Sequence, residues 1–259
     1  MKAVLLAGGL GTRMREETEF RPKPMVEVGG KPILWHLMKI FASQGITDFV
    51  VCGGYKGEQI KSYFLNYAAL NSDFTISLGR SAELVVHNDH LESEWTVTVA
   101  DTGLTTLTAG RVERIEPYVA GERFLVTYGD GLADIDVSRL IAFHESHGLK
   151  ASMTIVRPTS RFGIVEVDED AKVTRFREKP QSEDWVNAGF LVFEPAVFDY
   201  LRNSDGIMLE SEPLARLAAD RQLAAYHHNG FWQPMDTYRE AQMMNEMWAG
   251  GKAPWKTWG

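Results

Sequence analysis

The chain opens with MKAVLLAGGLGTR, where the apolar run from Ala3 to Leu6 passes directly into AGGLGTR, Ala7 to Arg13. The apolar run predicts a buried strand that ends at Ala7. Three glycines among residues 8–11 leave backbone N–H groups unshielded, so oxyanions can approach them closely. Thr12 adds a hydroxyl, and Arg13 adds a charged fork that suits phosphate oxygens. The pattern predicts a phosphate-binding loop, and the alternative is a plain tight turn from a strand to a helix.

Two common phosphate-binding motifs do not fit this region. A dinucleotide fingerprint would need glycine where Leu10 or Met14 stands. The Gly30-Lys31 pair is followed by Pro32 rather than serine or threonine, so it does not belong to a Walker A loop. The sequence therefore predicts neither a standard NAD site nor a P-loop, which weakens a dehydrogenase interpretation.

Composition and charge limit the classes of protein to which this chain can belong. Its 259 residues are 44% hydrophobic and 24% charged, as in a globular protein that can bury a full core. A net charge of -8 argues against non-specific binding to nucleic acid, which needs clustered Lys and Arg in excess. Its apolar stretches fall far short of the roughly 20 residues of a membrane span, and no signal-peptide pattern precedes the first strand. We expect a cytoplasmic protein without nucleic-acid or membrane partners, in which the single cysteine, Cys52, is a buried small hydrophobe.

Strands and helices alternate along the first part of the chain. Strands are expected at Lys2–Ala7 and Asp48–Cys52, and helices at Pro32–Ser43 and about Glu58–Tyr67. Such a βαβα order predicts parallel strands joined by right-handed crossovers. The segment from about 71 to 108 instead contains the short alternating runs FTISL, ELVVH and WTVTV, which predict antiparallel strands in an inserted or edge β-ribbon.

The rest of the chain returns to the alternating order. The expected elements are strands at Phe124–Tyr128, Ala151–Val156, Phe190–Phe193 and Leu223–His228, a hairpin within Phe162–Arg177, and helices at Gly110–Tyr118, Val137–His147, after Pro195, at Pro213–Ala219 and at about Thr237–Trp248. Residues 1–259 therefore read as one α/β domain that ends in a C-terminal helix and tail over about 237–259. We expect a mixed, mainly parallel sheet flanked by helices, with ligands at the carboxyl ends of the parallel strands.

Two charged residues stand at positions that favour ligand binding. Asp130 lies between two glycines after the strand expected at Phe124–Tyr128, which places its carboxylate at the edge of the sheet. Mg²⁺ binds one or two carboxylates together with phosphate oxygens and waters, so one further carboxylate would be enough. Lys23 stands between Pro22 and Pro24, which restrict the backbone and fix the direction of an exposed ammonium. We predict a magnesium ligand at Asp130 and a functional lysine at residue 23; for the aspartate, a turn-forming role is the alternative.

The stretch LAGGLGTRMREETEFRPKPMVEVGGKPIL, residues 6–34, resembles the sugar-1-phosphate nucleotidyltransferases, whose signature is a GGxGTR loop followed by PKP. The similarity covers nearly the whole chain, because it continues through TYGDG (Thr127–Gly131), REKP (Arg177–Pro180), NAGF (Asn187–Phe190) and GFWQPMDT (Gly230–Thr237). It implies a Rossmann-like nucleotide-diphospho-sugar transferase fold and the transfer of a nucleotidyl group to a sugar 1-phosphate.

The resemblance also implies roles for individual residues. Arg13 would bind the β- and γ-phosphates, Lys23 would touch the nucleotide phosphates, and Asp236 would be the second magnesium ligand. On sequence alone, Asp236 is equally a helix N-cap. The full expected sets are catalytic Arg13, Lys23 and Asp130; nucleotide-binding Leu6, Ala7, Gly8, Gly9, Leu10, Gly11, Thr12, Arg13, Lys23, Thr106, Gly110, Arg111 and Gly129; sugar-phosphate-binding Glu178, Lys179, Asn187 and Gly189; and metal-binding Asp130 and Asp236.

The sugar and base sites are assigned through the same resemblance. Glu178 would bond sugar hydroxyls and Lys179 the sugar phosphate, with an ordinary solvated ion pair as the alternative. Asn187 and Gly189 fit a sugar-contacting turn whose commoner sequence is NGGF. This chain has Ala188 in place of the first glycine, which adds one methyl group. The polar segment DTGLTTLTAGR, Asp101–Arg111, corresponds to the base-contacting region, and a plain surface loop is the alternative.

Within the family, the TYGDG and GFWQPMDT versions resemble those of members that use CTP and glucose 1-phosphate. The expected reaction is an Mg²⁺-assisted in-line attack of the sugar phosphate on the α-phosphorus of CTP, giving CDP-glucose and pyrophosphate. The alternatives are the same chemistry with another nucleotide or sugar, such as dTTP, and a non-catalytic regulatory subunit that binds sugar nucleotides. We also expect a homo-oligomer, because Trp248, Trp255 and Trp258 crowd the C-terminal end with aromatic surface and because relatives assemble into oligomers.

Overall fold

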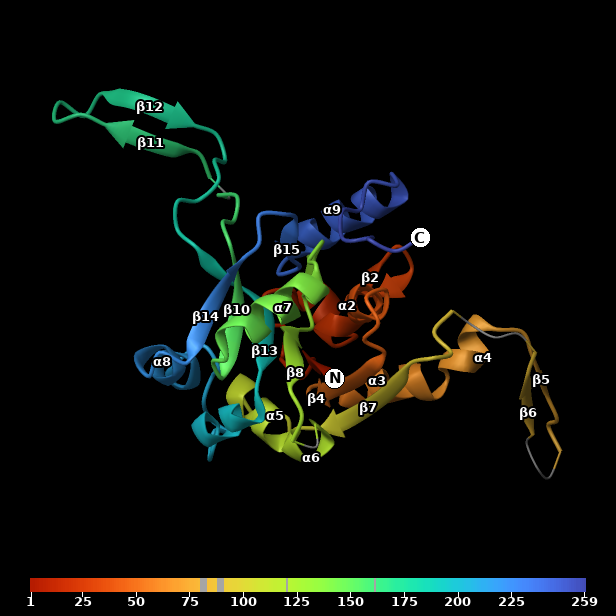
Figure 1. Cartoon of the computed structure of the whole chain (residues 1–259). Helices are drawn as coiled ribbons and strands as arrows, with labels where there is room; N and C mark the ends of the chain where they lie inside the picture. The colour runs from red at the N-terminus through yellow and green to blue at the C-terminus, as the bar shows by residue number, and fades with distance from the viewer. Residues whose placement is uncertain (80–82, 88–90, 120, 161) are drawn as a thin grey trace.

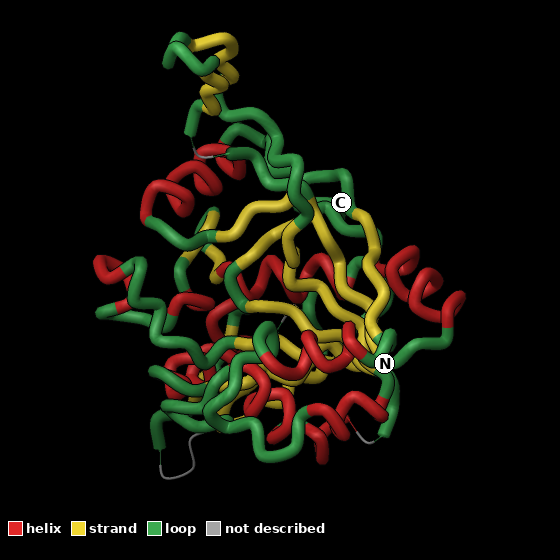
Figure 2. The backbone as a smooth tube through the Cα atoms, turned by 90° about the vertical axis from the view of Figure 1, so that its left-hand side faces the viewer, coloured by secondary structure: helices red, strands yellow, loops and turns green. Residues whose placement is uncertain are grey.

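The computed structural model describes residues 1–79, 83–87, 91–119, 121–160 and 162–259. Its centre is a seven-stranded sheet in the order β14-β10-β13-β8-β1-β4-β7. The strands are β1 (Lys2–Leu6), β4 (Asp48–Gly53), β7 (Thr96–Asp101), β8 (Phe124–Tyr128), β10 (Ala151–Val156), β13 (Val186–Phe193) and β14 (Leu223–His227). Helices lie on both sides of this sheet (Figures 1 and 2).

Parallel pairing dominates the sheet. Strand β1 pairs in parallel with β4 and β8, β4 with β7, and β10 with β14. Strand β13 runs antiparallel between β8 and β10. The carboxyl ends of all the other strands therefore meet at one edge of the sheet, where α/β proteins bind their ligands. This arrangement confirms the mixed, mainly parallel Rossmann-like sheet predicted from the sequence.

The helices close two hydrophobic cores, one on each face of the sheet. They are α1 (Arg15–Thr18), η1 (Lys23–Met25), α2 (Ile33–Ala42), α3 (Gly57–Leu65), α4 (Tyr67–Asn71), α5 (Thr108–Arg114), α6 (Glu116–Val119), α7 (Val137–His147), η2 (Pro195–Tyr200), α8 (Glu212–Ala219) and α9 (Tyr238–Ala249). Successive side chains of a strand point to opposite faces, so Ala3 and Leu5 pack with α2, α7 and α9, whereas Val4 and Leu6 pack with α5, α8 and η2. Cys52 is fully buried in the second core, as expected.

Two expected helices are divided in the structure. The helix expected at about Glu58–Tyr67 is divided into α3 and α4, which meet at Asn66. The second division has a simple steric reason. The expected helix at Gly110–Tyr118 is divided into α5 and α6, which meet at Ile115. Pro117 lacks an N–H, and its ring clashes with the carbonyl of the preceding helical turn, so α5 cannot continue through it. No helix in the described part of the chain is long and apolar enough to span a membrane.

Two-stranded ribbons extend the structure beyond the main sheet. They are β2 (Glu27–Val28) with β3 (Lys31–Pro32), β5 (Phe74–Ile76) with β6 (Leu84–Val86), β9 (Gly131–Ala133) with β15 (Trp232–Pro234), and β11 (Ile164–Val167) with β12 (Val173–Arg177). The β11–β12 ribbon confirms the predicted hairpin, and it projects from the body of the protein, as does β5–β6 (Figure 1).

The antiparallel prediction for WTVTV is wrong. These residues lead into β7, the parallel edge strand beside β4, so the antiparallel ribbon in this region is confined to β5 and β6. The alternation of threonine and valine arises because one face of β7 is packed against the core, through Val97 and Val99. Residues 80–82 and 88–90 of the predicted ribbon lie outside the described residues.

The C-terminal tail packs against the core of its own chain. Trp255 is fully buried, and its indole nitrogen donates to Nδ1 of His36 at 3.4 Å. Trp248 meets the ring of His36 edge-on, and Trp258 meets Trp35 in the same way. Trp255 therefore offers no surface to a second copy of the chain, whereas Trp248 and Trp258 remain half-buried. Helix α2 supplies their aromatic partners within the chain.

Candidate active site

The predicted phosphate-binding loop follows β1 at the carboxyl edge of the sheet, where it borders a cavity of about 410 Å³. The cavity is lined by Leu6, Ala7, Gly8, Gly9, Leu10, Gly11, Thr12, Arg13, Lys23, Pro24, Thr106, Leu107, Thr108, Arg111, Tyr128, Gly129, Asp130, Met208 and Asp236. It therefore brings together every predicted nucleotide-binding residue except Gly110, and both predicted metal ligands. Gly110 lies on α5, where a Cβ would meet the backbone of Asp205.

Glycine is required at two positions of the loop for different reasons. Gly11 has a φ of +63°, in the left-handed region, and a Cβ there would lie 2.6 Å from Cγ2 of Thr18. A Cβ on Gly8 would overlap the guanidinium of Arg111. Gly9, in contrast, is exposed and has open space around it, so its backbone is accessible from the cavity.

Arg111 ties the loop to two neighbouring segments. Its guanidinium donates to the carbonyl oxygens of Gly8 at 2.9 Å, Gly53 at 3.0 Å and Gly103 at 2.9 Å. The side chain is buried, and that burial lowers the pKa of the guanidinium. A planar fork with five donors suits several carbonyls at once. Arg111 therefore holds the backbone of the glycine loop at the cavity wall.

Lys23, Asp130 and Asp236 form a compact charged cluster at the cavity wall. Nζ of Lys23 donates to Oδ2 of Asp130 at 2.6 Å and to Oδ1 of Asp236 at 2.7 Å. Arg13 adds a bond from Nη1 to Oδ2 of Asp236 at 3.1 Å. Burial acts to lower the pKa of Lys23, but the two aspartates outweigh it and raise the pKa above its usual value. The ammonium is therefore charged at neutral pH, although it is largely buried rather than exposed as predicted.

The position of Asp236 is set by the start of the last helix. Thr237 is the N-cap of α9, where its hydroxyl accepts from the backbone of Glu240 and the Glu240 carboxylate accepts from the N-cap backbone. The same carboxylate accepts from the backbone N–H of Asp236 at 2.7 Å. The N-cap alternative for Asp236 is wrong, because Thr237 takes that role and directs the aspartate side chain toward Lys23.

The two carboxylates suit a hard divalent cation whose remaining coordination positions are filled by a bound ligand and waters. The carboxylates of Asp130 and Asp236 approach one another closely enough to hold a single ammonium between them. Among the described residues, no group of three or more His, Cys, Asp or Glu side chains could hold a metal by itself. Two carboxylates beside an open cavity are what Mg²⁺ uses when phosphate oxygens and waters complete its octahedron.

Tyr128 closes one side of the cavity and connects it to β13. Its hydroxyl donates to Oε1 of Glu210, whose other oxygen accepts from Thr108 at 3.0 Å. Burial, reinforced by the charge of Glu210, raises the pKa of Tyr128. Gly189 has a φ of +83°, and a Cβ there would overlap the ring of Tyr128. The TYGDG motif pointed to Tyr128, and the predicted base-contacting segment Asp101–Arg111 contains Thr108. No sequence signal marked Glu210.

The predicted sugar-site residues lie outside the lining of this cavity. Asn187 and Gly189 belong to β13 rather than to a turn, so that part of the prediction is wrong. Strand β13 is nevertheless irregular here, because Gly189 has a positive φ and the pairing of β13 with β10 shifts in register. Glu178 and Lys179 follow β12 at the base of the β11–β12 ribbon, where both are exposed and 3.9 Å separates their charged atoms.

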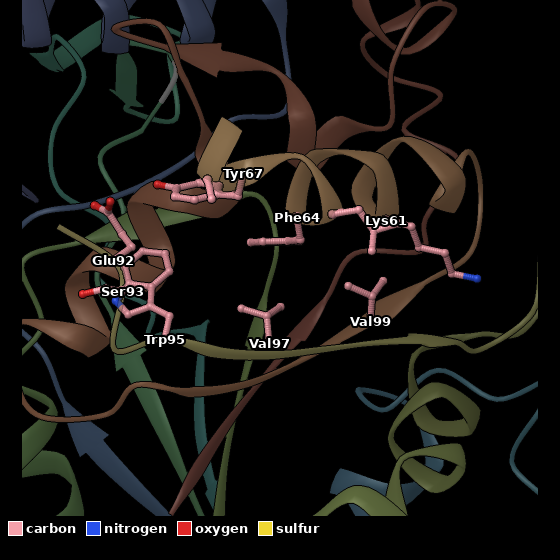
Figure 3. A pocket seen from close by; sticks show the side chains of 10 residues that line it. Lys61, Phe64, Tyr67, Glu92, Ser93, Trp95, Val97 and Val99 are labelled. Atoms are coloured by element: carbon pink, nitrogen blue, oxygen red, sulfur yellow. The ribbon is translucent and has the colours of Figure 1, made fainter. Parts of the chain in front are cut away.

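A second cavity, of about 570 Å³, lies between α3 and β7. Figure 3 shows Phe64 and Tyr67 on one side, with Trp95, Val97 and Val99 facing them. None of the predicted site residues lines it. Its walls are mainly apolar and carry neither the glycine loop nor the paired aspartates. The groups that suit phosphates and Mg²⁺ therefore lie in the cavity at the end of β1.

A layered α/β fold with a glycine loop at the carboxyl edge of its sheet is typical of proteins that bind nucleotides. Residues 2–243 match the family model described as "Nucleotidyl transferase", and the chain belongs to this family. Over its whole length it is 49% identical to the "Glucose-1-phosphate cytidylyltransferase" of Salmonella typhi, covering 100% of that protein as well.

More distant relatives agree with this assignment. The "Mannose-1-phosphate guanylyltransferase catalytic subunit beta" of Dictyostelium discoideum is 29% identical, over 91% of this chain and 62% of that protein. The solved structure of "HddC from Yersinia pseudotuberculosis complexed with GMP-PN" has a TM-score of 0.69 at 20% identity, and covers 95% of this chain and 99% of that one. At that level of identity the likeness establishes the fold.

Proposed function

We propose that this chain transfers the cytidylyl group of CTP to α-D-glucose 1-phosphate, giving CDP-glucose and pyrophosphate. The observation that carries the proposal is the meeting of the glycine loop, two cationic side chains and two aspartates in one cavity. The choice of CTP and glucose 1-phosphate rests on the full-length similarity to the Salmonella typhi protein of that name.

Charge neutralisation is the central task of the site. The sugar phosphate is already an anion at neutral pH, so its oxygen can attack the α-phosphorus without a general base. A bond forms between that oxygen and the α-phosphorus, the bond from the α-phosphorus to the bridging oxygen breaks, and pyrophosphate leaves. Arg13, Lys23 and the amides of residues 8–13 orient the triphosphate and offset the repulsion between two polyanions. Mg²⁺ held by Asp130 and Asp236 would supply further charge neutralisation at the phosphates.

The sugar phosphate would occupy the side of the cavity that faces β13. Gly189 packs against Tyr128, which lines the cavity, so Asn187 and Gly189 can shape the entry for the sugar. Glu178 and Lys179 would bond the sugar hydroxyls and its phosphate from the base of the β11–β12 ribbon. Their present exposure leaves both side chains available to a ligand.

The base would lie near the segment that leads into α5. Thr106 and Arg111 line the cavity beside the glycine loop. Gly110 would act indirectly, since its lack of a Cβ lets α5 pack closely on the segment at Asp205. Arg111 would support the nucleotide through the loop backbone that it holds.

Pyrophosphate release across a panel of nucleoside triphosphates and sugar 1-phosphates tests the proposal. We expect the highest kcat/KM with CTP and glucose 1-phosphate in the presence of Mg²⁺. A preference for dTTP, or for a different sugar phosphate, would replace the proposed substrates and leave the chemistry intact. Binding of CDP-glucose without any pyrophosphate release would instead support a regulatory subunit and overturn the proposed activity.

Self-association remains part of the proposal, on a different basis from the tryptophans. The β5–β6 ribbon exposes Phe74, Ile76 and Leu84 by 46%, 43% and 47%, and an isolated two-stranded ribbon is marginally stable in water. A second copy of the chain would bury this surface. Light scattering at working concentration should give a multiple of the mass of one chain, and a monomeric mass would contradict it. The cytoplasmic location stays a prediction from composition.

A further inference from the structure

Lys23 lies where a cation shared by Asp130 and Asp236 would lie. Its Nζ is 2.6 Å from one carboxylate and 2.7 Å from the other. These carboxylates come from separate parts of the fold, one after β8 and the other before α9. The ammonium therefore neutralises the same pair of aspartates that the proposed reaction needs for its divalent cation.

The charges of this cluster are already balanced. Lys23 and Arg13 contribute two positive charges, and Asp130 and Asp236 contribute two negative charges. A divalent cation that entered beside the ammonium would leave a net charge of about +2 in a partly buried site, where repulsion between like charges is poorly screened. A triphosphate supplies the missing negative charge.

We propose that Lys23 is a resident counter-ion that keeps divalent metal out of the Asp130–Asp236 pair until a nucleoside triphosphate binds. The incoming phosphates attract the ammonium away from the aspartates, and the vacated carboxylates then hold the metal that accompanies the nucleotide. This inference rests on the proposed function for the identity of the triphosphate. In this proposal, Lys23 exchanges its carboxylate partners for phosphates before the chemical step.

The local structure permits this exchange. Pro22 has φ -67° and ψ 148°, and Pro24 is buried within η1, so the backbone of Lys23 is held in place. The lysine side chain has four rotatable carbon links and a point-like charge, so its ammonium can change partners without movement of the backbone. Both Lys23 and the glycine loop line the cavity, which places the phosphates within the range of that movement.

The exchange requires metal and nucleotide to bind with positive coupling. Each ligand removes the obstacle to the other, and the coupling free energy is the same in both directions. Without nucleotide, a metal must compete with a covalently attached ammonium at the same carboxylates. The free protein should therefore bind divalent metal weakly, and loss of the lysine charge should relieve the competition.

Titration with Mn²⁺, followed by the electron paramagnetic resonance signal of the free ion, tests the inference without turnover. For the nucleotide-free protein we expect the Lys23→Met variant to bind Mn²⁺ at least tenfold more tightly than the wild type. Addition of the non-hydrolysable analogue of CTP with a methylene between the α- and β-phosphates should tighten Mn²⁺ binding strongly in the wild type. The same addition should have at least tenfold less effect in the variant.

Two further variants make the result decisive. Arg13→Met also removes one positive charge beside Asp236 but leaves the ammonium between the aspartates, so it should tighten Mn²⁺ binding much less than Lys23→Met does. If Lys23→Met fails to fold, Lys23→Gln retains polar contacts and gives the same comparison. Asp130→Asn in the Lys23→Met background should abolish the gained Mn²⁺ affinity.

Several results would overturn the inference. Equal Mn²⁺ affinities for the nucleotide-free wild type and Lys23→Met would do so, as would equal gains for Lys23→Met and Arg13→Met. If the Mn²⁺ gain appears while no pair of substrates yields pyrophosphate, the counter-ion role stands and the proposed reaction fails. The two failures are therefore distinguishable.

Discussion

Lys23 and Asp130 are 107 positions apart in the chain, and a 2.6 Å hydrogen bond joins their side chains at the carboxyl edge of the sheet. Parallel pairing of β1 with β8 makes this possible, since it brings Leu6 opposite Tyr128. The loop after β1 and the GDG segment after β8 therefore leave the sheet side by side. The contact links the two sequence motifs that bear most of the proposed chemistry.

Replacement of the carboxylate of Asp130 should remove activity without removing the fold. Asp130→Asn keeps the shape of the side chain but gives up the negative charge that would hold Mg²⁺ in the proposed reaction. We expect kcat to fall by about 10² to 10³ with little change in the melting temperature. Asp199→Asn, which changes an exposed carboxylate in η2, should leave both quantities unchanged. Near wild-type turnover by Asp130→Asn would refute the metal assignment.

Loss of Arg111 should destabilise the protein. Arg111→Met removes a buried donor from three carbonyl oxygens, of which those of Gly8 and Gly53 keep a backbone donor. We expect the free energy of unfolding to drop by about 2 to 3 kcal/mol. The KM for CTP should rise as well, because the glycine loop loses its support. Arg114→Met, which breaks an exposed pair with Asp205 and one bond to the carbonyl of Thr102, should cost about 1 kcal/mol. Similar denaturant midpoints for the two variants would contradict the role given to Arg111.

Two neighbouring glycines should respond differently to substitution by alanine. Gly8→Ala forces a methyl group into the Arg111 guanidinium, so its melting temperature should fall. Gly9→Ala adds a methyl group in open space, so the fold should be retained while the methyl group obstructs a phosphate. We expect KM for CTP to rise roughly tenfold in Gly9→Ala, a loss of about 1.4 kcal/mol in binding. Unchanged CTP kinetics in Gly9→Ala would place the triphosphate away from this loop.

His36 should make the fold sensitive to acid. Burial lowers the pKa of His36 to about 4, although its contact with the Val28 carbonyl opposes that effect. The unfolded chain takes up this proton near pH 6.5, before the folded chain does, so stability should fall as the pH decreases from 6.5 toward 4. The contribution of this one residue is about 1.4 kcal/mol per pH unit, or roughly 3 kcal/mol over the window.

Urea unfolding between pH 7.5 and pH 4.5 measures this dependence. The control is His36→Gln, whose amide can donate to the carbonyl of Val28 and accept from the indole of Trp255, as the neutral imidazole does. It does not titrate, so its free energy of unfolding should vary less with pH over the same range. Parallel pH profiles for the two proteins would assign the acid sensitivity to other groups.

Local patterns predicted most elements of this fold within a few residues. The apolar runs and caps of β8, α7 and β10 coincide with the observed bounds, because buried parallel strands and amphipathic helices leave strong periodic signals. The prediction was wrong for β7, a parallel edge strand whose alternating sequence was taken for an antiparallel ribbon. A half-buried strand alternates in the same way whichever direction its neighbour runs.

Local sequence likewise indicated some residues of the candidate site and missed others. The sequence indicated the glycine loop, Lys23 and Asp130 because proline and glycine place strong constraints on the backbone. It did not indicate Glu210, whose bond to Thr108 forms through contact between distant segments. It also misjudged Trp255, since burial of a single side chain depends on the partner that the fold brings to it.

By itself, the order of strands, helices and glycine-rich turns determined a mainly parallel α/β sheet with a glycine-rich loop at its carboxyl edge. The tertiary structure alone decided that Lys23 lies between Asp130 and Asp236, that Arg111 supports the loop, and that the tryptophans pack inward. The physical reason is the distance along the chain over which each interaction acts. Hydrogen bonding and side-chain periodicity act over a few residues, whereas ion pairs and core contacts depend on which distant segments the folded sheet places side by side.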